Sequence, residues 1–139
     1  MISLLLSIIT YSAITIVNSY LSLQLSIPLF LLTFYVLPLS VNFVIYKIQK
    51  VNWKSLTAIV LPTFSLVSYL AFAYITSSNG SWLKFVQINT MSDNNMSLEI
   101  ATDLFATSQV LFVAVLFYGV SLAHHFISQK VSNKGVQHA

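Results

Sequence analysis

YKIQKVNWK, residues 46–54, contains three of the six lysines in the chain, and long apolar segments flank it on both sides. The chain has 139 residues, of which 57% are hydrophobic and only 6% are charged. Soluble domains carry about 25% charged residues, so six lysines and three acids are too few for an ordinary water-facing surface. The composition therefore predicts an all-α protein embedded in a membrane.

Four apolar segments are long enough to cross the bilayer, which requires about 20 residues of helix. We predict spans at about residues 2–20, 27–46, 56–75 and 104–126, within a single membrane domain of residues 1–139. The runs are continuous, whereas the strands of a membrane barrel would alternate apolar and polar residues. The first span lacks the basic start of a secretory signal and is interpreted as retained. The short connection at residues 21–26 predicts a tight hairpin of the first two spans, and the four spans are expected to form two hairpins.

The lysines predict the orientation of the chain, because lysine-rich loops stay on the cytoplasmic side of a membrane. Lys47, Lys50 and Lys54 place the loop between the second and third spans inside. The tail at residues 127–139 also carries lysines and is predicted to be cytoplasmic. Counting spans back from the loop places the N-terminus inside as well. The expected location is thus the cell membrane, as a multi-pass protein with both termini cytoplasmic.

Residues 76–103 form the only long polar connection and are predicted to lie outside. Trp82, Phe85 and Val86 share one helical face there, which is typical of an amphipathic helix lying in the headgroup layer. An irregular loop with its aromatic side chains dipped into the interface fits the same residues. The polar run SDNN at 92–95 offers helix caps, so the fourth helix is expected to begin near Met96.

Several residues outside the spans are candidates for topology or for contact with a partner. Trp53 and Trp82 fall at predicted membrane interfaces, where indole rings are enriched. The full candidate set is Lys47, Lys50, Lys54, Trp53, Trp82 and Lys84.

The sequence offers little for catalysis or metal binding. It contains no cysteine, which excludes disulfides and thiolate chemistry. Asp93, Glu99 and Asp103 lack the spacing of a calcium loop and are interpreted as solvated acids at the start of the fourth helix. We expect no metal, no cofactor and no enzymatic activity.

His124 and His125 close the fourth span at the cytoplasmic boundary. Neighbouring helical residues point about 100° apart, so the pair cannot chelate one metal as residues at i and i+4 do. A proton relay, a pH-sensitive element or haem ligation are possible roles. The simpler interpretation is a polar end to the helix, where a cationic imidazole is favoured.

Three amides lie in or near the predicted hydrocarbon region: Asn18, Asn42 and Gln109. Each is expected to face another helix, because interhelical hydrogen bonds of this kind stabilise membrane proteins by roughly 0.6 to 2 kcal/mol. Pro38 and Pro62 lie inside spans, where a missing backbone donor predicts kinks.

The chain resembles the Msa family, small bacterial membrane proteins named as modulators of an accessory virulence regulator. The resemblance rests on the length, the four spans and Leu37-Pro38 late in the second span, followed by YKIQKVNWK. An outer loop with Lys84-Phe85 and a lysine-bearing tail complete it. The tail VSNKGVQHA is less basic than the resemblance implies. The family implies a cytoplasmic-membrane protein with a regulatory or signalling role and no established catalytic residues.

The expected function is therefore that of a non-enzymatic regulatory or accessory membrane protein. Its expected partners are the lipid bilayer and another membrane protein or further copies of the chain, with no nucleic acid. Residues 46–54 and 81–99 are the candidate contact segments. A small transport-related subunit or oligomeric carrier is the first alternative, and an immunity protein against a membrane-active toxin is the second.

Overall fold

The structure, a computed structural model, describes residues 2–93, 96–98 and 100–136. Its helices and strands follow one another along the chain in the order α1 (Ile2–Leu21), α2 (Ile27–Leu31), α3 (Leu37–Ile48), α4 (Lys54–Ser78), α5 (Ser81–Asn89), β1 (Met91–Asp93), β2 (Met96–Leu98) and α6 (Thr107–Val136). A π-helical turn, Leu32–Val36, joins α2 to α3, and 3-10 turns at Ser22–Gln24 and Val51–Trp53 precede α2 and α4.

Four helical segments are long and apolar enough to cross a membrane, which confirms the predicted number of spans. They cover Leu5–Gln24, Ile27–Ile48, Lys54–Ser78 and Thr107–Val131. The predicted beginning of the fourth helix near Met96 is wrong, since residues 96–98 form strand β2 and α6 begins only at Thr107. Asp103 lies before the helix, where its Oδ1 accepts a hydrogen bond from the Phe105 N–H at 2.8 Å.

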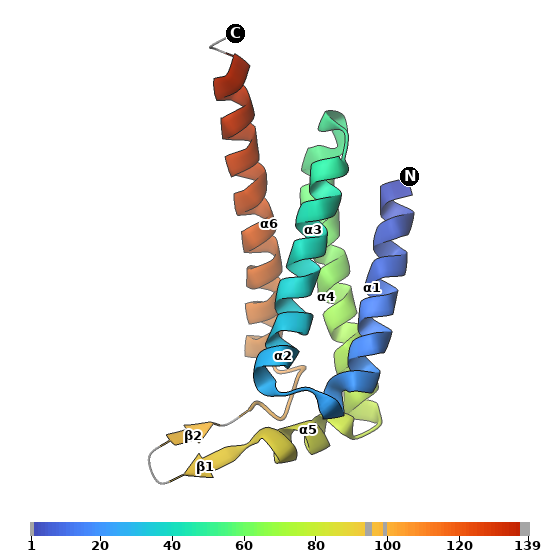
Figure 1. The fold of residues 1–139 in the computed structure, drawn as a ribbon, viewed down its shortest axis with the longest axis vertical. Helices are drawn as coiled ribbons and strands as arrows, with labels where there is room; N and C mark the ends of the chain where they lie inside the picture. Colours follow the sequence, from blue (N-terminus) through green and yellow to red (C-terminus); the bar gives the residue numbers. More distant parts are fainter. Residues whose placement is uncertain (1, 94–95, 99, 137–139) are drawn as a thin grey trace.

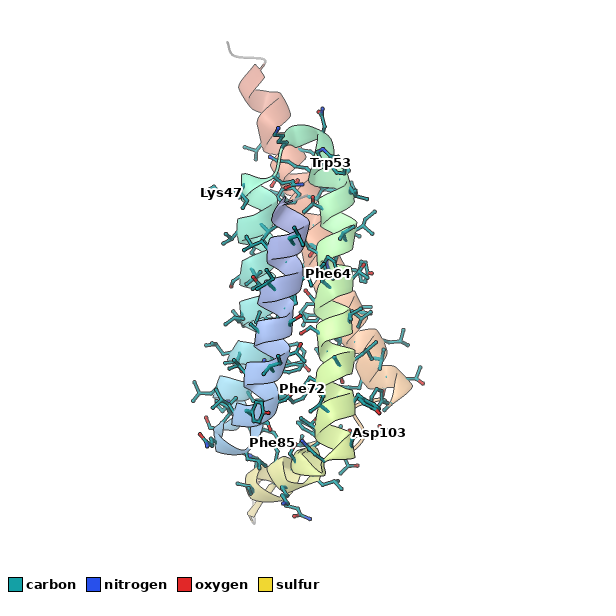
Figure 2. The ribbon with its side chains drawn as sticks, turned by 90° about the vertical axis from the view of Figure 1, so that its right-hand side faces the viewer. Lys47, Trp53, Phe64, Phe72, Phe85 and Asp103 are labelled. Atoms are coloured by element: carbon teal, nitrogen blue, oxygen red, sulfur yellow. The ribbon has the colours of Figure 1, made fainter. Side chains whose placement is uncertain are left out.

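Helix α4 is the centre of the bundle, because it packs against α1, α3 and α6 (Figure 1). Helix α1 packs mainly on α4 and only to a small extent on α3. This differs from the expectation from the short connection at residues 21–26, which predicts that α1 packs most closely on the second span. Figure 2 shows α1 and α4 running side by side.

The two ends of the bundle differ in what lies there (Figure 1). The start of α1, the turn between α3 and α4 and the end of α6 all lie at one end, which we call the lysine end (residues 46–54 and 124–131). Helix α5 and the β1–β2 hairpin lie at the opposite end. Figure 2 labels Lys47 and Trp53 at the first end and Phe85 and Asp103 at the second.

Prolines affect the second and third spans differently. The π turn ends immediately before Leu37-Pro38, and its wider ring makes room at a position where a proline ring would clash with the carbonyl one turn earlier. Pro62, by contrast, lies inside α4, which continues from Lys54 to Ser78. The predicted disturbance at Pro38 thus takes the form of a π turn, while α4 has no break at Pro62.

Gly80 turns the chain from α4 into α5. Its φ of 72° lies in the left-handed region, which a residue without Cβ adopts readily. Asn79 supports the turn, since its Oδ1 accepts a hydrogen bond from the Ser81 N–H at 2.9 Å. This turn folds α5 across the end of the bundle (Figure 1).

Helix α5 is amphipathic, as one of the two interpretations of this segment expected, but its apolar face points into the protein. Trp82 and Phe85 are only 3% and 1% exposed. The indole N–H of Trp82 donates to the Ala101 carbonyl at 3.1 Å, which ties the connection before α6 to α5. The expectation that these aromatic side chains enter the headgroup layer is therefore wrong for Trp82 and Phe85.

The β1–β2 hairpin follows α5. Met91 pairs with Leu98 and Asp93 with Met96 in an antiparallel ladder. Asp93 thus lies in a strand and does not cap a helix. Residues 94–95 and Glu99, which the sequence pattern assigns to helix capping, lie outside the described residues.

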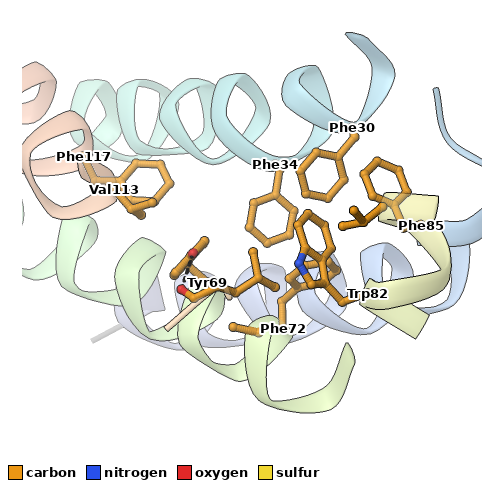
Figure 3. Packing of buried hydrophobic residues seen from close by; sticks show 11 residues of the cluster. Phe30, Phe34, Tyr69, Phe72, Trp82, Phe85, Val113 and Phe117 are labelled. Carbon is orange, nitrogen blue, oxygen red and sulfur yellow. Dashed lines mark hydrogen bonds between the residues drawn. The ribbon is translucent and has the colours of Figure 1, made fainter. Parts of the chain in front are cut away.

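An aromatic cluster forms the main core and joins α2, the π turn, α4, α5 and α6 (Figure 3). Phe30 contacts Phe34, Trp82 and Phe85 with ring centroids 5.0–5.6 Å apart, and Phe72 lies 4.3 Å from Phe34. Such pairs add stability beyond their buried area. We call the region around these rings the aromatic end; its buried residues are Phe30, Phe34, Tyr69, Phe72, Ala73, Trp82, Phe85, Val86, Leu104, Val113 and Phe117.

Candidate functional site

A buried polar network joins α1, α3 and α4 inside the bundle. The Tyr11 hydroxyl donates to Oδ1 of Asn42, and the Asn42 amide donates to the Ser65 Oγ at 3.1 Å. Ser65 Oγ also lies 3.0 Å from the Tyr11 hydroxyl, which closes a three-membered ring. All three side chains are at most 4% exposed. The network lies near the middle of α1 and of the third span and in the second half of the second span.

Further polar contacts extend this network along α1. Thr15 Oγ1 and Ser68 Oγ are 2.6 Å apart across the α1–α4 contact. One turn further on, the Asn18 amide donates to the Thr33 carbonyl at 3.5 Å. Helix α1 is therefore bonded to its neighbours by polar groups at three successive turns.

Each of the three predicted interhelical amides contacts another helix or turn. Asn18 and Asn42 bond as described, and the Gln109 amide donates to the Tyr35 hydroxyl at 3.3 Å, joining α6 to the π turn. Polar groups in hydrocarbon require internal partners. The arrangement holds the helices in one register and leaves these amides with hydrogen-bond partners inside the protein.

A groove between α1 and α4 lies beside the Thr15–Ser68 contact and is open to the outside of the bundle. Its volume is about 270 Å³. Small, hydroxyl-bearing and apolar residues line it: Ile8, Tyr11, Ser12, Thr15, Phe64, Val67, Ser68 and Ala71. Figure 2 places Phe64 halfway along α4, beside α1. Surfaces of this composition suit close approach of another membrane helix.

At the lysine end, His125 is held by hydrogen bonds to both ring nitrogens. Nδ1 lies 2.7 Å from the Tyr46 hydroxyl, and Nε2 lies 3.1 Å from the Gln129 amide nitrogen. His125 is only 7% exposed and joins α6 to α3, with both ring nitrogens in hydrogen bonds within the protein.

The side chain of His124 leaves α6 in a different direction from that of His125, because neighbouring helical residues point about 100° apart. Its ring packs against Phe43 and Tyr46, with centroids 4.6 and 4.9 Å apart. No group of three metal-ligating side chains that could hold an ion is present in residues 2–93, 96–98 and 100–136. The two histidines are therefore arranged as contacts between helices.

Ser121 lies one turn below His125 and has an unusual environment. Its Oγ is the only buried polar side-chain atom without a hydrogen-bond partner among the described residues. A void of about 10 Å³ adjoins it, and Asn42, Thr57 and His124 also line this void. That volume holds about one water molecule. The polar network of the bundle interior and the histidine contacts thus border the same small void.

The remaining candidate residues from the sequence divide between the two ends. Lys47, Lys50, Lys54 and Trp53 all lie at the lysine end, and Trp53 is 53% exposed. Lys84 lies on α5, whose neighbouring Trp82 is buried. The structure does not bring these six residues into one site.

Sequence reasoning missed Tyr11, Ser65 and Tyr46, which hold the polar network and the histidine pair together. A signal for Tyr11 was present. A tyrosine in the first half of an apolar span has a hydroxyl that requires a partner, and the amide of Asn42 requires one too. Serines gave no such signal, because a helical serine can bond to the carbonyl of the preceding turn.

Comparison of the chain with protein-family models, curated proteins and solved structures finds no match. The resemblance to the Msa family therefore stays a prediction from the sequence.

Proposed function

We propose that the chain is a non-enzymatic accessory or regulatory protein of the cell membrane, which acts by binding a transmembrane helix of another membrane protein. The α1–α4 groove is the proposed binding site. The expected alternatives, an oligomeric carrier and an immunity protein, differ from this proposal in what occupies the groove: a second copy of the chain or a toxin segment.

The composition of the groove carries the proposal. Most of the exposed surface of α1 bears large apolar side chains such as Ile9 and Ile16, which are 65% and 54% exposed and suit lipid tails. The groove adds the small side chains of Ser12 and Ala71 to the apolar Ile8, Phe64 and Val67, over the mutually bonded Thr15 and Ser68. Small residues allow two helix backbones to approach closely.

A carrier is less well supported by the polar groups of the interior. A transport pathway normally places ionisable side chains at mid-depth. The mid-depth side chains here are uncharged, and Tyr11, Asn42 and Ser65 bond to one another. They join helices and do not surround an open polar passage.

We further propose that the lysine end faces the cytoplasm and that α5 and the hairpin lie outside. The distribution of charge supports this orientation. Lys47, Lys50, Lys54 and Lys130 belong to the end that holds both termini (Figure 1), whereas the three acids all occur at positions 93–103. Cytoplasmic retention of lysine-rich loops favours this direction.

Site-specific photocrosslinking in native membranes tests the groove. A photoreactive amino acid at Val67, on the groove wall, is expected to give one discrete adduct with a second membrane protein. The matched control is Ile59, which is equally exposed (54% against 55%) on the same helix but outside the groove; it should give only lipid adducts. Mass spectrometry identifies the captured chain.

A substitution that fills the groove makes this test specific. Ala71→Leu should abolish the Val67 adduct while the purified protein keeps its helical content by circular dichroism. A persistent adduct in Ala71→Leu would contradict the groove as the binding site. An adduct that consists only of a second copy of the chain would support the oligomeric carrier in place of the accessory protein.

A further inference from the structure

A second groove lies at the lysine end, between α3 and α6, and is separate from the α1–α4 groove. Its volume is about 420 Å³. It is open to the surroundings and combines cationic, hydroxyl and apolar side chains: Phe43, Val44, Tyr46, Lys47, Lys54, His124 and Ser128. Binding of a partner helix between α1 and α4 makes no use of this groove.

The positive charge of the groove has no acidic side chain to neutralise it. Acids occur in the sequence only at positions 93, 99 and 103, and Figure 2 shows Asp103 at the opposite end from Lys47. The Lys54 ammonium instead lies 5.5 Å from the centre of the Tyr46 ring, which places it at the groove wall. Two lysines therefore border one cavity with an imidazole and a hydroxyl, and no acidic side chain is among the residues that line it.

The apolar part of the groove indicates what kind of anion fits. Val44 is 62% exposed and Phe43 36% exposed, and both lie further inside the second span than Lys47. An acyl chain would lie along these side chains, while a phosphate would lie between the two lysines at the end of the spans. Basic pockets between membrane helices bind anionic lipid headgroups in this way.

We propose that this groove is a specific binding site for an anionic phospholipid. Lys47 and Lys54 bind its phosphate, Ser128 and His124 contribute hydrogen bonds, and one acyl chain lies against Phe43 and Val44. This goes beyond the general attraction of lysines to a negative membrane surface, because only two of the lysines at this end line the cavity. It also does not depend on a partner in the α1–α4 groove.

Native mass spectrometry of the full-length protein tests the site. The protein is reconstituted into phosphatidylcholine vesicles that contain a minority of phosphatidylglycerol, and is then released in a mild detergent. We expect one retained phosphatidylglycerol per protein. In Lys47→Gln/Lys54→Gln the ratio of lipid-bound to free protein should fall about tenfold or more, since each lysine near the surface attracts anionic lipid substantially.

The matched control removes the same charge elsewhere at the same end. Lys50 and Lys130 are exposed and do not line the groove, so Lys50→Gln/Lys130→Gln should change the bound fraction less than about twofold. A third variant, Val44→Trp, keeps every charge but fills the apolar part of the groove. It should also lose the retained lipid, and circular dichroism checks that each variant is folded.

Three outcomes would overturn the proposal. Equal losses in the two double variants would mean that the lysines attract lipid only through their summed charge. Displacement of phosphatidylglycerol by inorganic phosphate, with Val44→Trp unaffected, would mean that the groove binds a water-soluble phosphate and not a lipid. Retention of phosphatidylglycerol by Lys47→Gln/Lys54→Gln would likewise contradict the proposed site.

Discussion

At the aromatic end, α5 folds across the bundle and its Trp82 and Phe85 fill the space between the helices (Figures 1 and 3). At the lysine end, no element of the described residues crosses the bundle, and the α3–α6 groove is open. The first end has rings in contact on every side. The second has four lysines, two histidines and the exposed indole of Trp53. One end of the molecule is thus closed by packed rings, and the other keeps an open groove.

The largest expected change in stability comes from removing one aromatic ring at each end. Phe72 is fully buried and contacts Phe30, Phe34 and Trp82. Phe72→Ala should lower the free energy of unfolding by about 3–5 kcal/mol, the cost of a large cavity. Phe43→Ala, at the lysine end, should cost less than half as much because its ring is 36% exposed. Unfolding by titration with dodecyl sulfate in mixed micelles measures both.

The result would contradict the comparison if the two variants lost the same stability. Equal losses would mean that the lysine end is packed as tightly as the aromatic end, and the open α3–α6 groove would then require another explanation.

The next test concerns the polar network between the two ends. Asn42→Ala removes the bonds to Tyr11 and Ser65 and should destabilise the protein by about 1–2 kcal/mol. Ser40→Ala is the matched control on the same helix, since Ser40 is exposed and bonds only to the Val36 carbonyl. It should change stability by less than about 0.5 kcal/mol.

A double-mutant cycle with Tyr11→Phe sharpens this test. Because Tyr11 and Asn42 act on each other, the double variant should lose clearly less than the sum of the two single losses. Additive losses in the same micelle assay would mean that the two side chains stabilise the bundle independently.

The smallest expected effect comes from the turn that closes the aromatic end. Gly80→Ala should cost about 1 kcal/mol, because a side chain disfavours a φ of 72°. The added Cβ would meet no atom within 4 Å, so the cost is conformational and not steric. Gly119→Ala in α6 has the same free space and should be neutral or stabilising, because alanine favours a helix interior. A loss of stability in both variants would exclude the turn as the cause.

Hydropathy and length were enough to predict the four spans, because each long apolar helix meets the same requirement of the bilayer. The pairing of helices was not predictable in this way. A short connection brings α1 and α2 near each other in sequence, but α1 packs mainly on α4, where Thr15 and Ser68 meet. Hydropathy gives no information about which faces of two helices fit together.

The aromatic end illustrates a different limit. The spacing of Trp82, Phe85 and Val86 correctly indicated one apolar helical face. An apolar face is buried equally well against a membrane interface or against other helices, so the pattern alone could not separate the two. In the structure this face is buried against other helices, because Phe30 and Phe72, which are distant in sequence, contact the rings of α5. The lysine-end groove was likewise unpredictable, because it requires side chains from three segments.

The π turn changes the direction in which the later side chains of the second span point around the helix axis. Five of its six buried side chains follow one another every four residues: Phe30, Phe34, Pro38, Asn42 and Tyr46. In a regular α-helix, each step of four residues would rotate the stripe by about 40°, or about 160° from first to last. The extra residue in Leu32–Val36 subtracts about 100° from this drift. One widened turn thus keeps these side chains on nearly the same face of the second span. Phe30 contacts α5 at one end of this face, and Asn42 and Tyr46 bond to α4 and α6 toward the other end.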